Sequence, residues 1–132
     1  MTVQMIEAYY RAFNARDYTG MLALVADEVK HDINQGPREV GRDSFAVFLK
    51  RMDERYSEQI SELVVLSDKH GERFAAEFTV TGKYINADAG FPAAHGQRYE
   101  LPAGAFFEVD DNQITRVTMY YNLRDWLEQV RG

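Results

Sequence analysis

Residue patterns in this 132-residue sequence predict an α+β fold, in which N-terminal helices pack against one face of a curved antiparallel sheet. Apolar residues recur at steps of three and four in most of the first half, and alternate with polar residues from about residue 59 onward. Helices followed by long strands with short turns give this architecture. The number and length of the strands predict a strongly curved sheet that encloses a cavity against the helices. The length fits a single domain over residues 1–132.

Three helices are predicted before the long strands. The first covers residues 3–14, a short second one covers about 18–26, and the third covers about 43–56. Asp43 or Ser44 can cap the start of the third helix. The apolar stripes consist of Val3, Ile6, Tyr10 and Phe13 in the first helix, Met21, Leu22 and Val25 in the second, and Phe45, Phe48, Leu49, Met52 and Tyr56 in the third.

The strands follow a simple order. A short strand is predicted over residues 28–33, ahead of a turn at 36–41 that contains two glycines and a proline. Four longer strands begin near residues 60, 73, 97 and 114. The loop 86–96 separates the second of these from the third, and residues 123–130 form a short terminal helix.

Composition narrows the possible functions. The formal net charge is −6, and no block of basic residues is present, which argues against nucleic-acid binding. Cysteine is absent, so disulfides and thiolate metal sites are excluded. Charged residues among the first twenty argue against a signal peptide or a membrane span, and predict a cytoplasmic protein. Aromatic residues make up 13% of the chain, so they either fill the core or line a cavity.

Three segments carry a resemblance to a known superfamily. "YYRAFNARDYTGMLALVADEVKHD" (9–32) resembles the opening of NTF2-like proteins, in particular the ketosteroid isomerase and SnoaL-like polyketide cyclase branches. "TGKYINADAGFPAAHGQRYELP" (81–102), with Gly90, Pro92 and Gly96, resembles the SnoaL-like hairpin. "RVTMYYNLRDWLEQV" (116–130) resembles the closing strand and tail helix of the group. The resemblance implies a cone-shaped domain of the cystatin/NTF2-like kind, a homodimer formed through the outer sheet face, and no need for a metal or an organic cofactor.

The resemblance also points to Asp32 and Tyr9 as catalytic residues. Asp32 matches the general base of ketosteroid isomerase, and Tyr9 matches the tyrosine that donates to the developing enolate oxygen. Each has a plainer interpretation, Asp32 as a strand-ending residue that binds local backbone and Tyr9 as part of the helix core. Tyr10 competes with Tyr9. His31 neighbours Asp32 in a strand, so their side chains are expected on opposite faces.

One member of the isomerase constellation is missing. Its second, protonated aspartate corresponds to a position near Gly104, and residues 103–107 contain no acid. Loss of one oxyanion donor typically lowers the rate by about 10²–10³. The sequence therefore disfavours efficient steroid isomerisation and favours a different reaction or ligand.

Further residues are candidates for contact with a substrate. Asn34 shares its strand parity with Asp32, and Asn122 is predicted either to orient a substrate oxygen or to cap the terminal helix. His95 reaches the pocket only if the loop 86–96 folds over it as a lid. The candidates for an apolar wall are Phe13, Met52, Tyr56, Phe106, Tyr120 and Trp126, together with Phe48 and Tyr84.

Three functions are consistent with these patterns. The first is an isomerase- or cyclase-like enzyme, related to steroid Δ-isomerase, in which Asp32 moves a proton next to the carbonyl of a small hydrophobic substrate. The second is a non-catalytic protein that binds a small hydrophobic ligand. The third is a structural or interaction domain whose aromatic residues fill the core.

Overall fold

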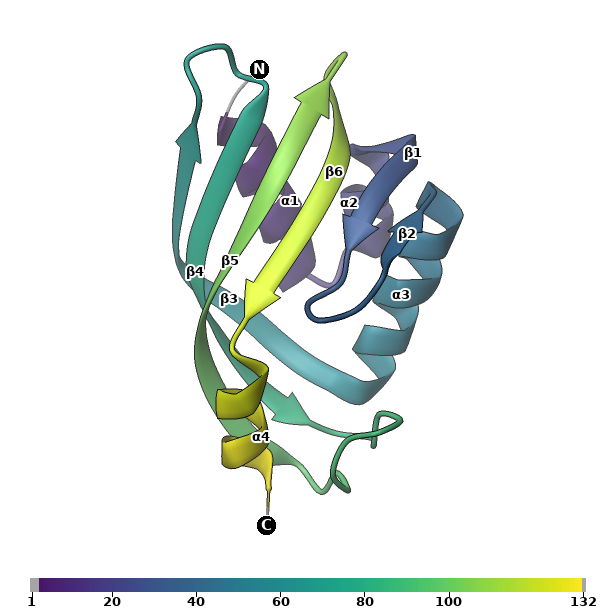
Figure 1. The fold of residues 1–132 in the computed structure, drawn as a ribbon, viewed down its shortest axis with the longest axis vertical. Coiled ribbons are helices and arrows are strands. Elements are labelled where there is room, and N and C mark those ends of the chain that lie inside the picture. The colour runs from purple at the N-terminus through teal and green to yellow at the C-terminus, as the bar shows by residue number, and fades with distance from the viewer. Residues whose placement is uncertain (1–2, 132) are drawn as a thin grey trace.

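A computed structural model describes residues 3–131 and places the helices α1, α2 and α3 against one face of a curved, open, six-stranded sheet (Figure 1). The predicted α+β fold with N-terminal helices is confirmed. No described helix is both long and apolar enough to cross a membrane. The elements are α1 Val3–Asn14, α2 Tyr18–Ala23, β1 Val25–Asp32, β2 Arg38–Val40, α3 Arg42–Arg55, β3 Tyr56–Ser67, β4 Arg73–Tyr84, β5 Gln97–Asp110, β6 Gln113–Tyr121 and α4 Leu123–Val130.

The strand order is β2-β1-β6-β5-β4-β3, and every pairing is antiparallel except that between β1 and β6. The helical pattern predicted to reach residue 26 ends at Ala23, because the carbonyl of Leu24 accepts a hydrogen bond (2.8 Å) from the N–H of Ile114. The Gly-Pro turn contains β2, which the sequence analysis missed. Both differences come from pairing between distant segments, and local periodicity carries no signal for it.

The ends of the first two helices depend on an Asn-x-x-Asp pair. Asn14 joins the end of α1 to β3, since its Oδ1 accepts from the N–H of Ile60 (2.8 Å) and its Nδ2 donates to the carbonyl of Ile60 (2.9 Å). Asp17 caps α2 by accepting from the N–H of Gly20 (2.9 Å). These contacts fix where α1 crosses the sheet.

Side chains alternate between an inner face of the sheet, which is covered by the helices, and an outer face. The even-numbered residues of β4 from Phe74 to Tyr84 are buried, as are almost all odd-numbered residues of β5 from Tyr99 to Val109. The register extends this pattern across the sheet. One inner row contains His31, Val117, Phe107 and Phe74, and the adjacent outer row contains Asp32, Thr118, Phe106 and Ala75.

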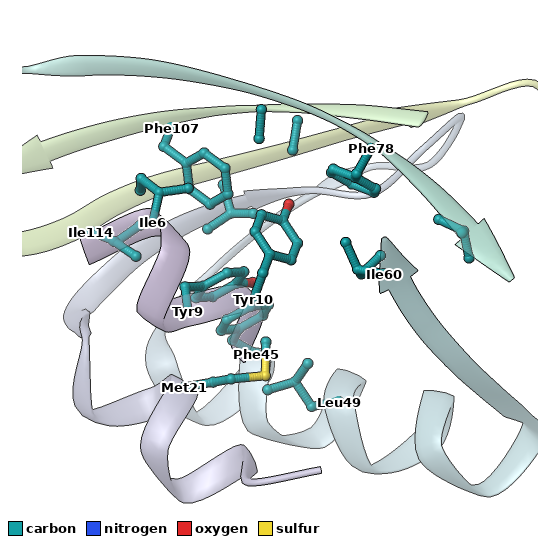
Figure 2. Close-up of a cluster of buried hydrophobic side chains, with 14 of the residues drawn as sticks. Ile6, Tyr9, Tyr10, Met21, Phe45, Leu49, Ile60, Phe78, Phe107 and Ile114 are labelled. Carbon is teal, nitrogen blue, oxygen red and sulfur yellow. The ribbon is translucent and has the colours of Figure 1, made fainter. Parts of the chain in front are cut away.

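Aromatic rings of α1 fill the space between the helices and the sheet (Figure 2). Tyr9 and Tyr10 are 5% and 6% exposed. They were predicted as competing candidates for an inward position, and both face inward. The Tyr9 ring lies 5.4 Å from that of Phe107, and the Tyr10 ring lies 4.9 Å from that of Phe78. The first pair is edge-to-face and the second is tilted, and aromatic contacts of this kind add to the stabilisation that burial gives.

Gly82 of β4 allows a close crossing by Tyr99 of β5, its partner in the ladder. A Cβ atom at position 82 would lie 2.5 Å from the Cζ and hydroxyl oxygen of Tyr99. The phenol ring therefore lies directly over the glycine and extends toward β3. An isolated glycine inside a strand often marks such an approach.

We expect Gly82→Ala to destabilise the fold by about 1–3 kcal/mol, because the methyl group would displace the Tyr99 ring. Urea denaturation measures the cost in the wild-type protein and in a Tyr99→Ala background, where the obstacle is gone. An equal cost in both backgrounds would contradict the proposed crossing.

Candidate functional site

On β1, the side chain that faces the helices is not the one predicted. His31 points to the inner face, and Asp32 points to the outer face, where it lies beside Thr118 of β6. The expectation that the two side chains lie on opposite faces is met. The orientation expected for Asp32 is reversed, because the register with β6 places the buried set on His31 and not on its neighbour.

The Asp32 carboxylate is part of a network of hydrogen bonds and ion pairs. Arg38 of β2 donates to both oxygens, Nε to Oδ1 (2.5 Å) and Nη2 to Oδ2 (2.9 Å), and the Thr118 hydroxyl donates to Oδ2 (2.5 Å). Arg116 in turn binds Thr118 and Glu108. These contacts, with Arg38 the largest, lower the pKa of Asp32 to about 2. A carboxylate held in this way is a weak base, and its surroundings stabilise β2 against the sheet.

His31 lies on the inner face with its ring 4.7 Å from that of Phe45 and 4.5 Å from that of Phe48, both on α3. Only 3% of the residue is exposed. Burial lowers its pKa to about 4, against a smaller opposing effect of the Asp32 charge, so the imidazole is neutral at pH 7. Its Nδ1 atom is buried without a hydrogen-bond partner.

A second carboxylate, Glu58 of β3, lies on the inner face in the same row as Gly82 and Tyr99. The Tyr99 phenol crosses Gly82 and donates to Glu58 Oε2 at 2.5 Å. Burial raises the pKa of Glu58 above its usual value, and the Tyr99 hydrogen bond opposes that effect in part. Desolvation of a carboxylate by apolar surroundings is the usual way to obtain a stronger carboxylate base.

Tyr121 and Asn34 lie next to this pair. The Tyr121 backbone N–H donates to Asn34 Oδ1 (3.2 Å), and the Asn34 Nδ2 atom is buried. Burial raises the pKa of the Tyr121 phenol, the charge of Glu58 raises it further, and the Asn34 side chain lowers it. We call Asn34, Glu58, Tyr99 and Tyr121 the inner polar cluster.

Aromatic residues and the loop 86–96 cover one side of this cluster. Trp126 of α4 contacts four aromatic rings, with centroid distances of 5.0 to 6.0 Å. Asp88 of the loop accepts from the Tyr56 hydroxyl (3.0 Å) and pairs with Arg55 (3.4 Å). The rings that Trp126 contacts belong to Tyr56, Tyr84, Phe91 and Tyr99.

Part of the inner face keeps accessible surface. Glu58, Ala103, Met119 and Tyr121 are partly exposed, whereas other inward-facing residues of β5 and β6 are buried. Hollows of about 290 and 310 Å³ lie elsewhere, one between β2 and α3 and the other on the outer face beside Phe106 and Arg116. Neither of these two hollows is lined by Asp32 or by the inner polar cluster.

The predicted site residues therefore fall into separate places. Asn34 belongs to the inner polar cluster, Tyr56 and Trp126 lie beside it, and Tyr9 lies in the core between α1 and the sheet. Phe13 and Met52 are partly buried on their helices, and His95 is exposed in the loop. Asn122 is exposed and caps α4, with its Oδ1 accepting from the N–H of Asp125 (3.1 Å).

Two predicted pocket residues are misplaced. Phe106 and Tyr120 lie on the outer face, where they are 45% and 56% exposed. The reason is strand parity, since the odd-numbered residues of β5 face inward and Tyr120 is in register with Gly104, an outward position. Sequence reasoning also missed Glu58, Tyr99 and Tyr121. Two features of the sequence could have indicated this group. Glu58 is in phase with the apolar residues Tyr56 and Ile60, and an isolated glycine, Gly82, lies in the next strand.

A curved sheet lined by an acid, two tyrosines and an amide, and covered by N-terminal helices, defines an α+β protein of the NTF2-like kind. Residues 6–117 match the SnoaL-like domain family, and the chain belongs to that family. No curated protein matches the sequence.

Solved structures support the same assignment. A candidate polyketide cyclase from Xanthomonas campestris pv. campestris is 53% identical, with a TM-score of 0.94, over 96% of this chain and 94% of that one. A candidate polyketide cyclase from Pseudomonas putida KT2440 is 52% identical, with a TM-score of 0.95, over 96% and 95%. An NTF2-like protein of unknown function from Burkholderia pseudomallei K96243 is 16% identical, with a TM-score of 0.84 over the full length of both chains, and shares the fold.

The lowered pKa of His31 predicts a pH-dependent stability. Its folded pKa of about 4 lies below the usual 6.5, so between these values the unfolded chain binds a proton that the folded chain does not. The contribution to stability is complete above pH 6.5 and falls as the pH drops. We expect the free energy of unfolding to fall by about 2 kcal/mol more between pH 7 and pH 5 in the wild type than in His31→Phe.

Chemical denaturation at several pH values measures this difference, and His70→Gln, a change in an exposed turn, is the control. An equal pH dependence in wild type and His31→Phe would show that His31 does not titrate as described.

Proposed function

We propose that the chain binds a small hydrophobic molecule at the inner polar cluster and moves a proton next to its carbonyl group, as an isomerase- or cyclase-like enzyme. Glu58 is the base in this proposal, in place of Asp32. The observation that carries it is the 2.5 Å hydrogen bond from Tyr99 to a carboxylate on the inner face whose pKa is raised by burial.

Glu58 has the properties that a base for this reaction needs. Poor solvation makes the carboxylate more reactive, and the Tyr99 hydroxyl holds it in one orientation. The carboxylate takes a proton from the carbon next to the carbonyl, and the C–H electron pair forms a C=C bond while the C=O pair moves onto oxygen. Return of the proton to a different carbon gives an isomer. In a cyclisation, the enolate carbon instead attacks a second carbonyl carbon of the same molecule, the C=O π pair of that carbonyl moves onto its oxygen, and Glu58 returns the proton to this oxygen.

Asp32 lacks these properties. Both of its oxygens accept from Arg38, one of them also accepts from Thr118, and its pKa is lowered to about 2. A substrate bound to the inner face would lie on the far side of the sheet from this carboxylate. Asp32 therefore belongs to the support of β2 in this proposal.

The surroundings of Glu58 favour an apolar ligand. Tyr56 is partly exposed near the carboxylate and is backed by the buried ring of Trp126, which also contacts Tyr99, and Met119 and Ala103 are partly exposed on the same face. Flat aromatic walls with few polar groups are typical of sites for hydrophobic ring systems. The description of two relatives as candidate polyketide cyclases agrees with a ligand of this kind.

A non-catalytic binding protein is the second candidate. It is favoured by the short hydrogen bond that already engages Oε2 of Glu58, since a group used only for orientation is well served by such a contact. Turnover separates the two candidates, because only the enzyme exchanges the proton next to the carbonyl.

The proposal includes a homodimer formed through the outer face. Large apolar side chains are exposed there in two nearby rows of the sheet, and such patches commonly mark interaction sites. Light scattering is expected to show a dimer in the wild type and a monomer in Tyr120→Lys, and a wild-type monomer would overturn this part. The exposed side chains are Val64, Leu66, Phe106 and Tyr120.

We expect Glu58→Gln to reduce proton transfer by at least about 10²-fold, because an amide cannot accept the proton. Tyr99→Phe is expected to give a smaller loss, about tenfold, since the carboxylate remains but is no longer oriented. The measurement is deuterium incorporation next to the carbonyl, followed by NMR, for a panel of cyclic enones and aromatic β-keto esters.

The matched control is Asp32→Asn, which removes the other candidate carboxylate and is expected to leave the exchange rate of the folded protein within about twofold of wild type. If Asp32→Asn abolishes exchange and Glu58→Gln retains it, the assignment of the base is wrong. If the wild type binds ligands without exchange, the binding-protein alternative holds.

A further inference from the structure

The loop 86–96 joins β4 to β5 at the end of the molecule that carries α4 (Figure 1), and one of its residues, Asp88, ties it to Arg55, Tyr56 and Tyr84. We propose that residues 87–95 form a hinged strap, latched by Asp88, whose opening admits small molecules to the aromatic side of the inner polar cluster. The proposal rests on the inner site described above and adds the route by which a ligand reaches it.

Asp88 is the point at which the strap meets the end of α3 and the start of β3. Its Oδ2 accepts from the Tyr56 hydroxyl (3.0 Å), and its Oδ1 pairs with Nε of Arg55 (3.4 Å). Its backbone N–H donates to the Tyr84 hydroxyl (2.9 Å). Only 12% of the Asp88 side chain is exposed, so solvent and salt screen this ion pair less than a surface pair. Removal of the Asp88 carboxylate therefore releases two of the three contacts.

The two ends of the loop are anchored by the backbone. The N–H of Ile85 donates to the carbonyl of Arg55 (2.8 Å). At the other end, the N–H of Gly96 donates to the carbonyl of Tyr84 (2.8 Å). Gly90 and Gly96 have φ angles of +84° and +86°, and a Cβ atom at either position would meet nothing within 4 Å. Glycines in free space can change their backbone angles without a clash, so the middle of the loop can swing between fixed ends.

The strap has little apolar contact with the rest of the molecule. Phe91 and Ala94 are its hydrophobic residues that pack against the core, and both are only partly buried. Asp88 and Pro92 are half-buried, and the other residues of the strap are exposed. Segments with few buried apolar contacts open at a lower free energy than the sheet that carries them. The strap is therefore expected to open while β4 and β5 stay paired.

Phe91 links the strap to the inner polar cluster. Its ring lies 5.3 Å from that of Trp126, and the Trp126 ring lies 6.0 Å from that of Tyr99, whose phenol donates to Glu58. Trp126 is 3% exposed while the strap is closed. Opening removes Phe91 from this ring and gives solvent and small molecules access to the aromatic side of the cluster. Closure over a bound ligand excludes water from it again.

Two measurements test the strap without a ligand. Trp126 is the only tryptophan of the chain, so quenching of its fluorescence by acrylamide measures how often its ring is uncovered. Amide hydrogen exchange at Phe91, whose N–H donates to the Asp88 carbonyl (3.0 Å), measures opening of the strap itself. Asp88→Ala is expected to increase the quenching constant and to raise the exchange rate at Phe91 about tenfold, the usual effect of one lost hydrogen bond. Exchange at Ala105, inside β5, should stay unchanged.

Two further variants separate the latch from a general loss of stability. Tyr56→Phe removes only the hydroxyl that donates to Asp88 and keeps the ring that stacks on Tyr84, so it should raise both quantities by a smaller factor. Asp27→Ala is the control, because it breaks an exposed ion pair with Arg42 (3.1 Å) on β1. It should change neither quantity.

The proposal is wrong if Asp88→Ala leaves exchange at Phe91 and quenching of Trp126 at their wild-type values. It is also wrong if exchange rises equally at Phe91 and at Ala105, because the strap would then open only with the sheet. If circular dichroism shows that Asp88→Ala does not fold, the same two criteria apply to Tyr56→Phe. Neither measurement involves the proposed base or a substrate, so a failure of the strap leaves the proposed reaction to its own test.

Discussion

The hydrogen bond from Tyr99 to Glu58 is the interaction on which the proposed site depends. It joins β5 to β3 across the intervening strand, and it exists because Gly82 of β4 leaves room for the phenol ring. The same ring contacts Trp126 of α4, so the terminal helix is packed against the residue that holds the carboxylate. A small change near the end of β4 would thus affect the base, the aromatic wall and the helix that covers it.

The period of two along a strand explains why Asp32 and Glu58 differ so much. If the register of β1 were shifted by one residue, Asp32 would face inward. It would then meet the rings of Phe45 and Phe48, which surround His31. On the outer face it meets Arg38 and Thr118, which keep it ionised. Glu58 is in phase with Ile60, the buried residue of β3, and burial of the carboxylate weakens its acidity. Strand register therefore assigns one carboxylate to structure and makes the other available for chemistry.

The sequence allowed the fold and most helices and strands to be predicted, because amphipathic periods and turn residues are local signals. It also placed His31 and Asp32 on opposite faces, but the match of Asp32 to a general base predicted that this side chain faces inward, whereas it lies on the outer face. That choice depends on the parallel pairing of β1 with β6, two segments far apart in the chain, and no local pattern encodes it. The partners of Glu58 were missed for the same reason, since Tyr99 and Tyr121 come from strands that meet it only in the folded sheet. Of the residues predicted for an apolar wall, Tyr56 and Trp126 lie on the inner side of the sheet, and Phe106 and Tyr120 lie on the outer face.

The pKa of Glu58 is the most direct test of this account. Carbon-13 NMR of the side-chain carboxyl group, followed through a pH titration, should give a value above the ordinary 4.5, because burial outweighs the hydrogen bond from Tyr99. The same titration of Tyr99→Phe should give a still higher value, since the bond that favours the charged form is lost. A wild-type pKa at or below 4.5 would contradict the account, because Glu58 would then be a solvated or ion-paired carboxylate with no advantage over Asp32 as a base.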